Sequence, residues 1–331
     1  MQRSICNCNV CVIGGAGFIG SHVVDHLIYS RDCKVLVLDN LISGLRKHVN
    51  PSADFVWFDI REDTEELTRL LSKYGAEYVF NYAAEPYVPE CFERPLHFFD
   101  INAVAVLRVL NACQQAGVKG ILQVSSAEIY GSCQGKISED APVAPHSTYG
   151  VSKLAADGLV QVRWREARVP AIAMRQFNCV GERETHEYVI PEIISQLHSL
   201  LQASRQVPLD DFVAEIWLGN DSTRDFQYAG DAAAMAVELL ECGNFGEVYN
   251  MGSENTIEIY SLAREISALM GYRRLVIHQD PNKVRPWEIW HLQSNNAKLY
   301  NTIKRRPEIP LREALQRTIE YFHSNGNQWD W

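Results

Sequence analysis

The chain has 331 residues, of which 47% are hydrophobic and 22% are charged, and its formal net charge is −10 at pH 7. This length can bury a sizeable core and suits one large α/β domain with a smaller lobe, or two domains. The negative charge argues against nucleic acid or an anionic membrane as a partner. No apolar run reaches the roughly 18 residues of a membrane span and no signal peptide is recognisable, so we expect a cytoplasmic protein.

Nine cysteines, an odd number, are scattered along the chain, which indicates reduced thiols and not a disulfide framework. Cys6, Cys8 and Cys11 form a Cys-x-Cys-x-x-Cys motif, and as metal ligands they would need a fourth partner such as Cys33 or a histidine. Cys11, however, falls inside the first predicted strand, where its side chain is committed to the core. We therefore predict small core residues here and no metal site.

The first half of the chain alternates strand-like apolar runs with helical stretches, which is typical of a parallel sheet built from βαβ units. The predicted strands are Val10–Ile13, Lys34–Leu38, Phe55–Phe58, Tyr78–Tyr82, Ile121–Ser125 and Ala171–Arg175. The predicted helices are Phe18–Tyr29, Glu62–Lys73, Pro95–Ala116 and Thr148–Ala167.

Near Phe177 this alternation stops, and irregular polar stretches separate the remaining helices. The polar stretches are Glu182–Tyr188, Gln202–Ala214 and Gln279–Trp290. The helices are Pro191–Leu201, Asp231–Cys242, Ile259–Met270 and Leu311–His323. The change predicts a second, smaller lobe that lies over the mouth of the sheet.

A glycine motif, Gly14-Gly-Ala-Gly17-Phe-Ile-Gly20, follows the first predicted strand and opens the first helix. Glycines there permit a tight turn, close approach of the backbone to a pyrophosphate and close packing of helix on strand. Asp39 ends the second strand, where a carboxylate would accept both hydroxyls of a ribose and repel a 2′-phosphate. No arginine immediately follows Asp39, so NAD is favoured over NADP. Asp59, which ends the third strand, either binds the adenine amino group or is a solvated loop acid.

Tyr149-Gly-Val-Ser-Lys153 lies on a predicted helix, and its spacing puts both end residues on one face. The ammonium of Lys153 can lower the pKa of the Tyr149 phenol from its ordinary value near ~10 toward the working pH. A phenolate beside a nicotinamide can take the proton of a sugar hydroxyl while hydride leaves the same carbon. Ser125, Ser126 and Glu128 follow at the carboxyl end of the fifth strand, where open α/β sheets bind ligands.

Two further segments predict ligand contacts. Asn81-Tyr-Ala-Ala84 ends the fourth strand with small residues, as a backbone that touches a cofactor would require. Arg224 and Arg285 are the best candidates to hold a diphosphate, because a guanidinium matches phosphate bidentately, although each is individually more often a surface arginine.

Together these residues resemble the extended short-chain dehydrogenase/reductase family, specifically its nucleotide-sugar members. The resemblance covers nearly the whole chain and includes Ala83-Ala-Glu-Pro-Tyr-Val88, Arg175-Gln-Phe-Asn178, Thr223-Arg-Asp-Phe226 and Arg285-Pro-Trp-Glu288. It implies an α/β fold with a Rossmann-type doubly wound parallel sheet. It also implies an NAD-binding domain at residues 1–178 and about 229–252, and a nucleotide-sugar-binding lobe at residues 179–228 and 253–331.

The resemblance implies a site of three parts. The catalytic residues are Tyr149, Lys153, Ser126, which meets the sugar 4-hydroxyl, and Glu128. The NAD contacts are Gly14, Gly17, Phe18, Ile19, Gly20, Asp39, Asn40, Asp59, Ile60, Ala83, Ala84, Ser125, Tyr149 and Lys153. The substrate contacts are Glu85, Asn178, Val189, Arg224, Arg285 and Glu288, of which Asn178, Arg224, Arg285 and Glu288 hold the diphosphate.

Glu128 favours a 4,6-dehydratase, because 4-epimerases of the family usually carry a residue there that cannot act as a base. The segments Tyr188–Pro191, Leu218–Phe226 and Asn295–Lys298 resemble dehydratases that act on GDP-mannose or on UDP- or GDP-N-acetylglucosamine. Ala127 departs from the dTDP-glucose dehydratases, which place an aspartic acid there, and Asp39 departs from the NADP preference of GDP-mannose dehydratases. A 4-epimerase, a UDP-glucuronate decarboxylase and a dinucleotide-sensing module remain alternatives, and the base and sugar of the substrate stay open.

The resemblance also implies a homodimer, in which the helices around Pro95–Ala116 and Thr148–Ala167 form a four-helix bundle across a twofold axis. The apolar content of these helices exceeds what one sheet-facing stripe needs. The apolar residues are Val104, Val106, Leu107, Leu110, Leu154, Leu159 and Val160.

Overall fold

A seven-stranded parallel sheet forms the centre of the computed structural model, which describes residues 3–203, 212–285 and 287–329. The strand order is β10-β6-β5-β4-β1-β2-β3, as in doubly wound dinucleotide-binding sheets. The strands are β1 (Asn9–Ile13), β2 (Lys34–Asp39), β3 (Asp54–Trp57), β4 (Tyr78–Asn81), β5 (Gly120–Ser126), β6 (Ala171–Gln176) and β10 (Val248–Met251). All six strands predicted in the first half are present, with ends shifted by a single residue at most.

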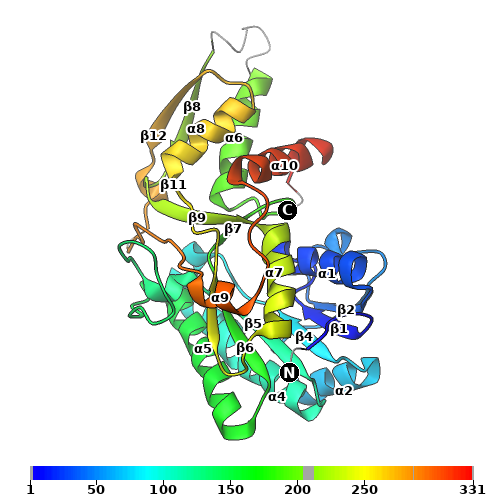
Figure 1. Cartoon of the computed structure of the whole chain (residues 1–331). Coiled ribbons are helices and arrows are strands. Elements are labelled where there is room, and N and C mark those ends of the chain that lie inside the picture. The colour runs from blue at the N-terminus through cyan, green and yellow to red at the C-terminus, as the bar shows by residue number, and fades with distance from the viewer. Residues whose placement is uncertain (1–2, 204–211, 286, 330–331) are drawn as a thin grey trace.

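Helices cover both faces of this sheet (Figure 1). On one face α1 (Phe18–Arg31) packs beside α7 (Ala229–Cys242), and Val10 and Val12 of β1 point into their core. Cys11 and Ile13 point into the opposite core. That core is covered by α2 (Thr64–Tyr74), α4 (Ala105–Gln115) and α5 (Thr148–Ala167). Because successive side chains face opposite ways, a strand buried on both faces is apolar throughout, which explains why these strands could be predicted.

The predicted helix over Pro95–Ala116 is interrupted. It consists of α3 (Pro95–Phe99), a π-helical turn (Asp100–Val104) and α4. The turn buries Asn102, whose side-chain amide donates to Glu85 O and accepts from Glu85 N, both at 3.0 Å. By length and composition Pro95–Gln115 could cross a membrane, contrary to our expectation for the sequence, but 56% of its most apolar window is buried inside the fold.

A smaller lobe, built from most of the second half of the chain, lies at one end of the molecule, at the top of Figure 1. Its core lies between a parallel pair of strands, β8 (Val213–Leu218) and β12 (Arg274–Gln279), and three helices. The helices are α6 (Val189–Ala203), α8 (Ile259–Leu269) and α10 (Leu311–Ser324). A second small sheet holds β7 (Asn178–Val180), β9 (Thr223–Tyr228) and β11 (Thr256–Glu258). The short α9 (Ala297–Thr302) and 3₁₀ turns at Arg46–His48, Val88–Phe92, Ala127–Tyr130 and Pro281–Lys283 complete the described elements.

The four helices predicted in the second half are present, but strands β7 to β12 and helix α9 were not predicted. Part of the predicted irregular stretch Gln202–Ala214 lies outside the described residues, and its end belongs to β8. Strand β8 alternates buried and exposed side chains, and this period of two is the sequence signal of a half-buried strand. The other missed strands are mostly short, so their patterns are weak.

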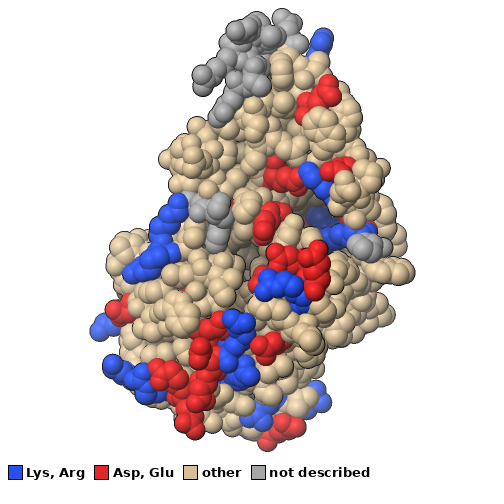
Figure 2. All heavy atoms as spheres, turned by 180° about the vertical axis from the view of Figure 1, so that it is seen from behind, with Lys and Arg blue, Asp and Glu red and all other residues tan. Residues whose placement is uncertain are grey.

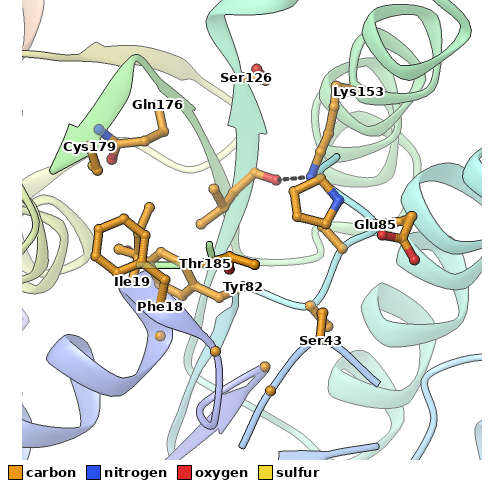
Figure 3. A pocket seen from close by; sticks show the side chains of 18 of the residues that line it. Phe18, Ile19, Ser43, Tyr82, Glu85, Ser126, Lys153, Gln176, Cys179 and Thr185 are labelled. Carbon is orange, nitrogen blue, oxygen red and sulfur yellow. Dashed lines mark hydrogen bonds between the residues drawn. The ribbon is translucent and has the colours of Figure 1, made fainter. Parts of the chain in front are cut away.

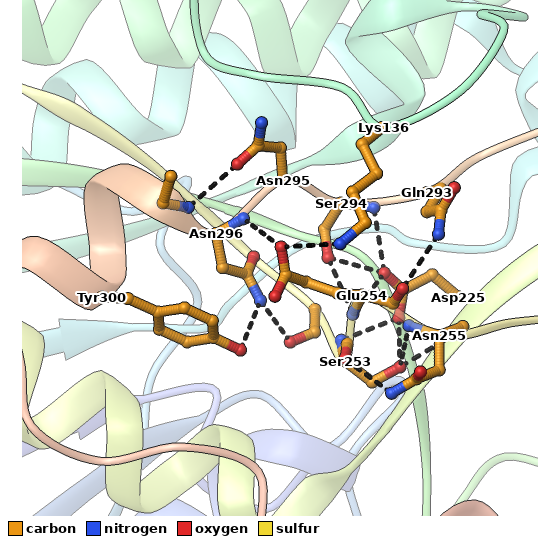
Figure 4. A network of polar contacts seen from close by, with 12 residues as sticks. Lys136, Asp225, Ser253, Glu254, Asn255, Gln293, Ser294, Asn295, Asn296 and Tyr300 are labelled. Atoms are coloured by element: carbon orange, nitrogen blue, oxygen red, sulfur yellow. Dashed lines mark hydrogen bonds and ion pairs between the residues drawn. The ribbon is translucent and has the colours of Figure 1, made fainter.

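A carboxylate-centred network fixes the lobe to the end of the sheet (Figure 4). Asp225 on β9 is fully buried, and its two oxygens accept five hydrogen bonds of 2.6–3.0 Å. The donors are the backbone and hydroxyl groups of Ser253 and Ser294 and the backbone N–H of Glu254. This network therefore joins β9 to the segments that follow β10 and precede α9.

Acidic and basic side chains are interspersed on the face seen in Figure 2, with wide uncharged areas between them.

Candidate active site

A cavity of about 310 Å³ lies at the carboxyl ends of the parallel strands, where ligands bind in open α/β sheets. All fourteen predicted NAD contacts line it, as do Ser126 and Glu128. Of the predicted substrate contacts, Glu85, Asn178, Val189 and Arg285 line it, whereas Arg224 and Glu288 do not. In Figure 3, Ser126 and Lys153 lie at one end of the cavity and Ser43 lies at the other.

The glycine loop forms one wall of the cavity through its backbone. A Cβ added to Gly14, whose φ is +79°, would lie 2.5 Å from Ala83 N, and one added to Gly20 would lie 2.1 Å from Gly14 O. Larger residues are therefore excluded at both positions. Helix α1 begins directly after Gly17 and has no side-chain cap, so its first N–H groups remain able to bind a phosphate. These features fit a dinucleotide.

Asp39 is held at the cavity by backbone groups. Its carboxylate accepts from Leu41 N at 2.8 Å and from Ala16 N at 3.0 Å, and burial raises its pKa. A Cβ at Gly44 would lie 2.7 Å from Asp39 Oδ1, so the loop that follows β2 also needs a glycine. This carboxylate is positioned to accept hydrogen bonds from a ribose.

Asp59 is not a free loop acid, which was one of the two interpretations of its sequence position. Arg61 donates to both of its oxygens, at 2.7 and 3.0 Å, and Asn40 donates at 2.9 Å. The hydrogen bonds from Arg61 hold the pKa of this carboxyl well below its usual range. Asp59 is therefore an ionised acceptor in the wall of the cavity.

Tyr149 and Lys153 lie on α5, which begins after Ser147, whose hydroxyl accepts from Gly150 N. Both side chains are buried, and the Lys153 ammonium lies 5.8 Å from the centroid of the Tyr149 ring. Lys153 donates to Val124 O at 3.4 Å, as the dashed line in Figure 3 shows. The predicted proximity of the two groups is therefore present in the structure.

The predicted direction of the Tyr149 pKa is wrong. Burial raises the pKa of this phenol, and the hydrogen bond with Ser126 and the charge of Arg285 offset the effect only in part. Burial also lowers the pKa of Lys153 to about 8, against the opposing charge of Asp157. Sequence spacing identified the pair but not its desolvation, which is a property of the packed fold.

Glu128 follows β5 in a 3₁₀ turn, and its backbone N–H donates to the Ser126 hydroxyl at 3.2 Å. Its carboxylate lies 3.3 Å from the guanidinium of Arg285, which is about one-third exposed. A potential base and a potential diphosphate ligand are thus paired with each other. This pairing was not predicted from the sequence.

Arg224 and Glu288 form a second pair, 3.0 Å apart, in which both side chains are about nine-tenths buried. Burial lowers the pKa of Arg224, and the charge of Glu288 opposes this shift. Because neither residue lines the cavity, their predicted contact with a diphosphate stays a prediction.

The segment before α6 supplies cavity residues that the sequence analysis treated as an irregular stretch. Glu184, Thr185 and Tyr188 line the cavity. Glu184 is 3% exposed, burial raises its pKa well above the ordinary value, and its Oε2 has no hydrogen-bond partner among the described residues. The sequence signal was the polar run directly after the Arg175–Asn178 motif.

Comparison with known proteins identifies the family. Residues 10–252 match the NAD dependent epimerase/dehydratase family. The chain belongs to this family. The UDP-glucose 4-epimerase of Lacticaseibacillus casei is 34% identical over 287 residues, which span 80% of this chain and 85% of that protein. The predicted family, fold class and NAD cofactor are confirmed.

Two solved structures cover nearly the whole chain. One is the dTDP-glucose 4,6-dehydratase of Bacillus anthracis in complex with NAD, which is 25% identical with a TM-score of 0.83 over 97% of this chain and 98% of that one. The other is the UDP-glucose 4-epimerase of Thermotoga maritima with UDP-glucose, which is 26% identical with a TM-score of 0.85 over 96% and 99%. The family thus includes two reactions, and the fold alone does not distinguish them.

Proposed function

We propose that this protein is a nucleotide-sugar 4,6-dehydratase, which converts an NDP-hexose into an NDP-4-keto-6-deoxyhexose and water. The observation that carries the proposal is the Glu128 carboxylate, which lines the cavity two residues after the Ser126 hydroxyl that meets Tyr149. Oxidation at C4 needs a base and a hydride acceptor only. A second carboxylate beside that base has a use where a C–H bond next to the new ketone must also be broken.

The first step takes place at the Ser126–Tyr149 pair. Ser126 orients the 4-hydroxyl, and Tyr149 removes its proton, with Lys153 as the adjacent cation. Bound NAD would supply the hydride acceptor for C4 and, later, the hydride donor for C6. Because burial raises the pKa of Tyr149, the hydrogen bond with Ser126 and the charge of Arg285, which both lower it, are needed to favour the phenolate.

The second step takes place at Glu128. The C4 ketone acidifies the C5 proton, and the carboxylate removes that proton and passes it to the C6 hydroxyl, which leaves as water. After C6 is reduced, C5 takes up a proton from solvent, so the net change is the loss of one water. One carboxyl group suffices for both transfers, and this is consistent with the buried, apolar Ala127 beside Glu128.

The substrate class we propose is a nucleoside diphosphate sugar, with UDP or GDP as the nucleotide and N-acetylglucosamine or mannose as the sugar. The Thermotoga maritima relative was solved with UDP-glucose. Arg285 is the cavity-lining guanidinium that can take a diphosphate, and a diphosphate there would compete with Glu128 for the same positive charge. Substrate binding would thereby release the Glu128 carboxylate toward C5.

We also propose a cytoplasmic homodimer in which the helices of Pro95–Gln115 and α5 form a four-helix bundle across a twofold axis. Several apolar residues on these helices are exposed. They are Leu96, Phe99, Val104, Val151 and Val162. Three residues expected in this interface, Val106, Leu110 and Val160, are instead buried in the core of the subunit and cannot meet a partner. The division into an NAD-binding domain and a nucleotide-sugar-binding lobe likewise stays a proposal.

A 4-epimerase is the second candidate, because one observation favours it. In the structure Glu128 is paired with Arg285. In an epimerase, the sole role of this carboxylate would be to hold the arginine in place. Epimerisation requires Tyr149, Lys153 and Ser126 alone. The two candidates therefore differ in whether Glu128 takes part in the chemistry.

The deciding experiment incubates the protein with a panel of nucleotide sugars in deuterated water and follows the products by mass spectrometry. A dehydratase yields a product that has lost one water and carries one deuterium at C5. Glu128→Gln should reduce this product by about 10²–10⁴-fold, whereas Glu166→Gln, a control at an exposed site on α5, should not. Borodeuteride should still trap a 4-keto sugar on the Glu128 variant, since C4 oxidation does not use this carboxylate.

The proposal fails if the wild-type protein only interconverts C4 epimers and Glu128→Gln retains full activity. That outcome would establish the epimerase, which leaves the deuterium content of the C5 position unchanged.

A further inference from the structure

A pair of thiols lies at the edge of the parallel sheet, at the amino ends of β1 and β2. Cys8 and Cys33 directly precede these strands, and their sulfur atoms lie 3.8 Å apart. Both are buried in the core that α1 and α7 cover, on the same face of the sheet as Val10 and Val35. Cys6, which is exposed, lies two residues before Cys8.

The backbone register places the two cysteines side by side. Asn9 pairs with Lys34 in the parallel ladder, and Lys34 N donates to Cys8 O at 3.0 Å. Cys8 and Cys33 therefore occupy the adjoining positions of neighbouring strands, which run about 4.8 Å apart. A disulfide needs Cα atoms about 4.4–6.8 Å apart, so the backbone already meets this requirement.

The third cysteine of the sequence motif, Cys11, faces away from the pair. Cys11 points into the opposite core and is fully buried, so it cannot join Cys8. Within the part of the chain that the structure describes, no group of three or more metal-ligating side chains is found. The cluster thus consists of two thiols in contact, Cys8 and Cys33, with the exposed thiol of Cys6 nearby.

We propose that Cys8 and Cys33 form a reversible disulfide when the protein is exposed to a peroxide. The Cys33 thiolate attacks one peroxide oxygen, the O–O bond breaks, and Cys33 becomes a sulfenic acid as one water is released. The Cys8 thiol then attacks the Cys33 sulfur and displaces a second water. Two thiols and one hydrogen peroxide thus give one disulfide and two waters, and a dithiol reductant reverses the change.

The surroundings of the pair assign these roles. The hydrogen bond with Cys8 lowers the pKa of Cys33, and the Arg31 guanidinium adds to this effect, whereas the same hydrogen bond raises the pKa of Cys8. Cys33 is therefore the thiol that ionises first and reacts with the oxidant. Arg31 also lies 3.7 Å from the sulfur of Cys6 at the surface.

The crosslink would close a loop that contains the glycine motif and all of α1. A loop of this length restricts the unfolded chain, so the oxidised protein should have a Tm about 5–10 °C above that of the reduced protein. Because the pair lies at the amino ends of the strands, it is outside the cavity lining.

The test treats the full chain with hydrogen peroxide, alkylates the remaining thiols and maps the peptides by mass spectrometry. We expect a mass lower by two hydrogens, one peptide that links Cys8 to Cys33, and complete reversal by dithiothreitol. Cys8→Ser and Cys33→Ser should each abolish the link and the rise in Tm. Cys113→Ser, a buried thiol on α4 remote from the pair, should preserve both.

Two results would overturn the proposal, and both are obtained with the wild-type protein. In one, wild-type protein keeps the thiols of Cys8 and Cys33 free while the peroxide oxidises exposed Cys6. In the other, the link that forms joins a different pair of the nine cysteines.

Discussion

The two ends of the cavity are built in different ways. At the cofactor end the shape comes from the backbone, because the glycine loop packs on Ala83 and backbone N–H groups hold Asp39. At the end near Glu128, which we propose binds the sugar and call the sugar end, side chains from separate elements meet, and Glu128 is paired with Arg285. The cofactor end is thus shaped by its own backbone, whereas the charges of Glu128 and Arg285 satisfy each other, and on our proposal a substrate would compete for them.

The largest effect should come from Tyr149→Phe, which removes the base but keeps the ring. We expect product formation to fall by about 10²–10⁴-fold, while the affinity for NAD, measured by calorimetry, falls much less, because Tyr149 is one of many predicted NAD contacts. Tyr29→Phe, at an exposed position of α1, should match wild type. If NAD affinity and turnover fell by the same factor, the functions of the cofactor end and the sugar end could not be separated.

Substitution of the two paired arginines, Arg224 and Arg285, should affect stability and substrate binding differently. Arg224→Ala leaves Glu288 buried without its charged partner, so we expect the free energy of unfolding to fall by about 3–5 kcal/mol. Arg285→Ala breaks a more exposed pair and should cost about 0–1 kcal/mol, but it should raise KM about tenfold or more. Denaturant unfolding and steady-state kinetics on both variants check this. A stability loss at Arg285 as large as that at Arg224 would contradict its assignment to the substrate.

At the cofactor end, Asp39→Ala removes the carboxylate that should accept the ribose hydroxyls. Hydrogen bonds to a charged group are typically worth about 1.5–3 kcal/mol, so NAD affinity should fall about 10–100-fold. NADP affinity should stay constant or rise, since the repulsion of a 2′-phosphate is lost. Titration of both dinucleotides into both proteins measures the change, and wild-type preference for NADP would refute the interpretation.

The same contrast explains how far the sequence could be interpreted. The cofactor end depends on glycines, small residues and Asp39 within consecutive βαβ units, so local spacing predicted it. The sugar end depends on pairings such as Glu128 with Arg285, which lie 157 positions apart. No spacing rule encodes such a contact, and none reports the desolvation that raises the pKa of Tyr149.

Two buried carboxylates sharpen the comparison further. Asp225 accepts five hydrogen bonds, whereas Glu184 at the cavity has an oxygen without a partner among the described residues. Asp225→Asn should therefore lower the free energy of unfolding, because it removes an acceptor from a satisfied network. Glu184→Gln should instead raise the free energy of unfolding at neutral pH.

The sign follows from the pKa of Glu184, which burial raises above its unfolded value of about 4.3. Between those two values the folded chain holds a proton that the unfolded chain has released, so stability falls as pH rises, by up to about 1.4 kcal/mol per pH unit. Glutamine has nearly the shape of a protonated glutamate and does not titrate, so the variant does not lose stability in this way as pH rises. Glu184→Gln should thus unfold at higher denaturant than wild type at about pH 8, and the gap should shrink at about pH 5. A gap that does not change with pH would show that Glu184 is already ionised in the folded protein, with a partner at the cavity that satisfies its charge.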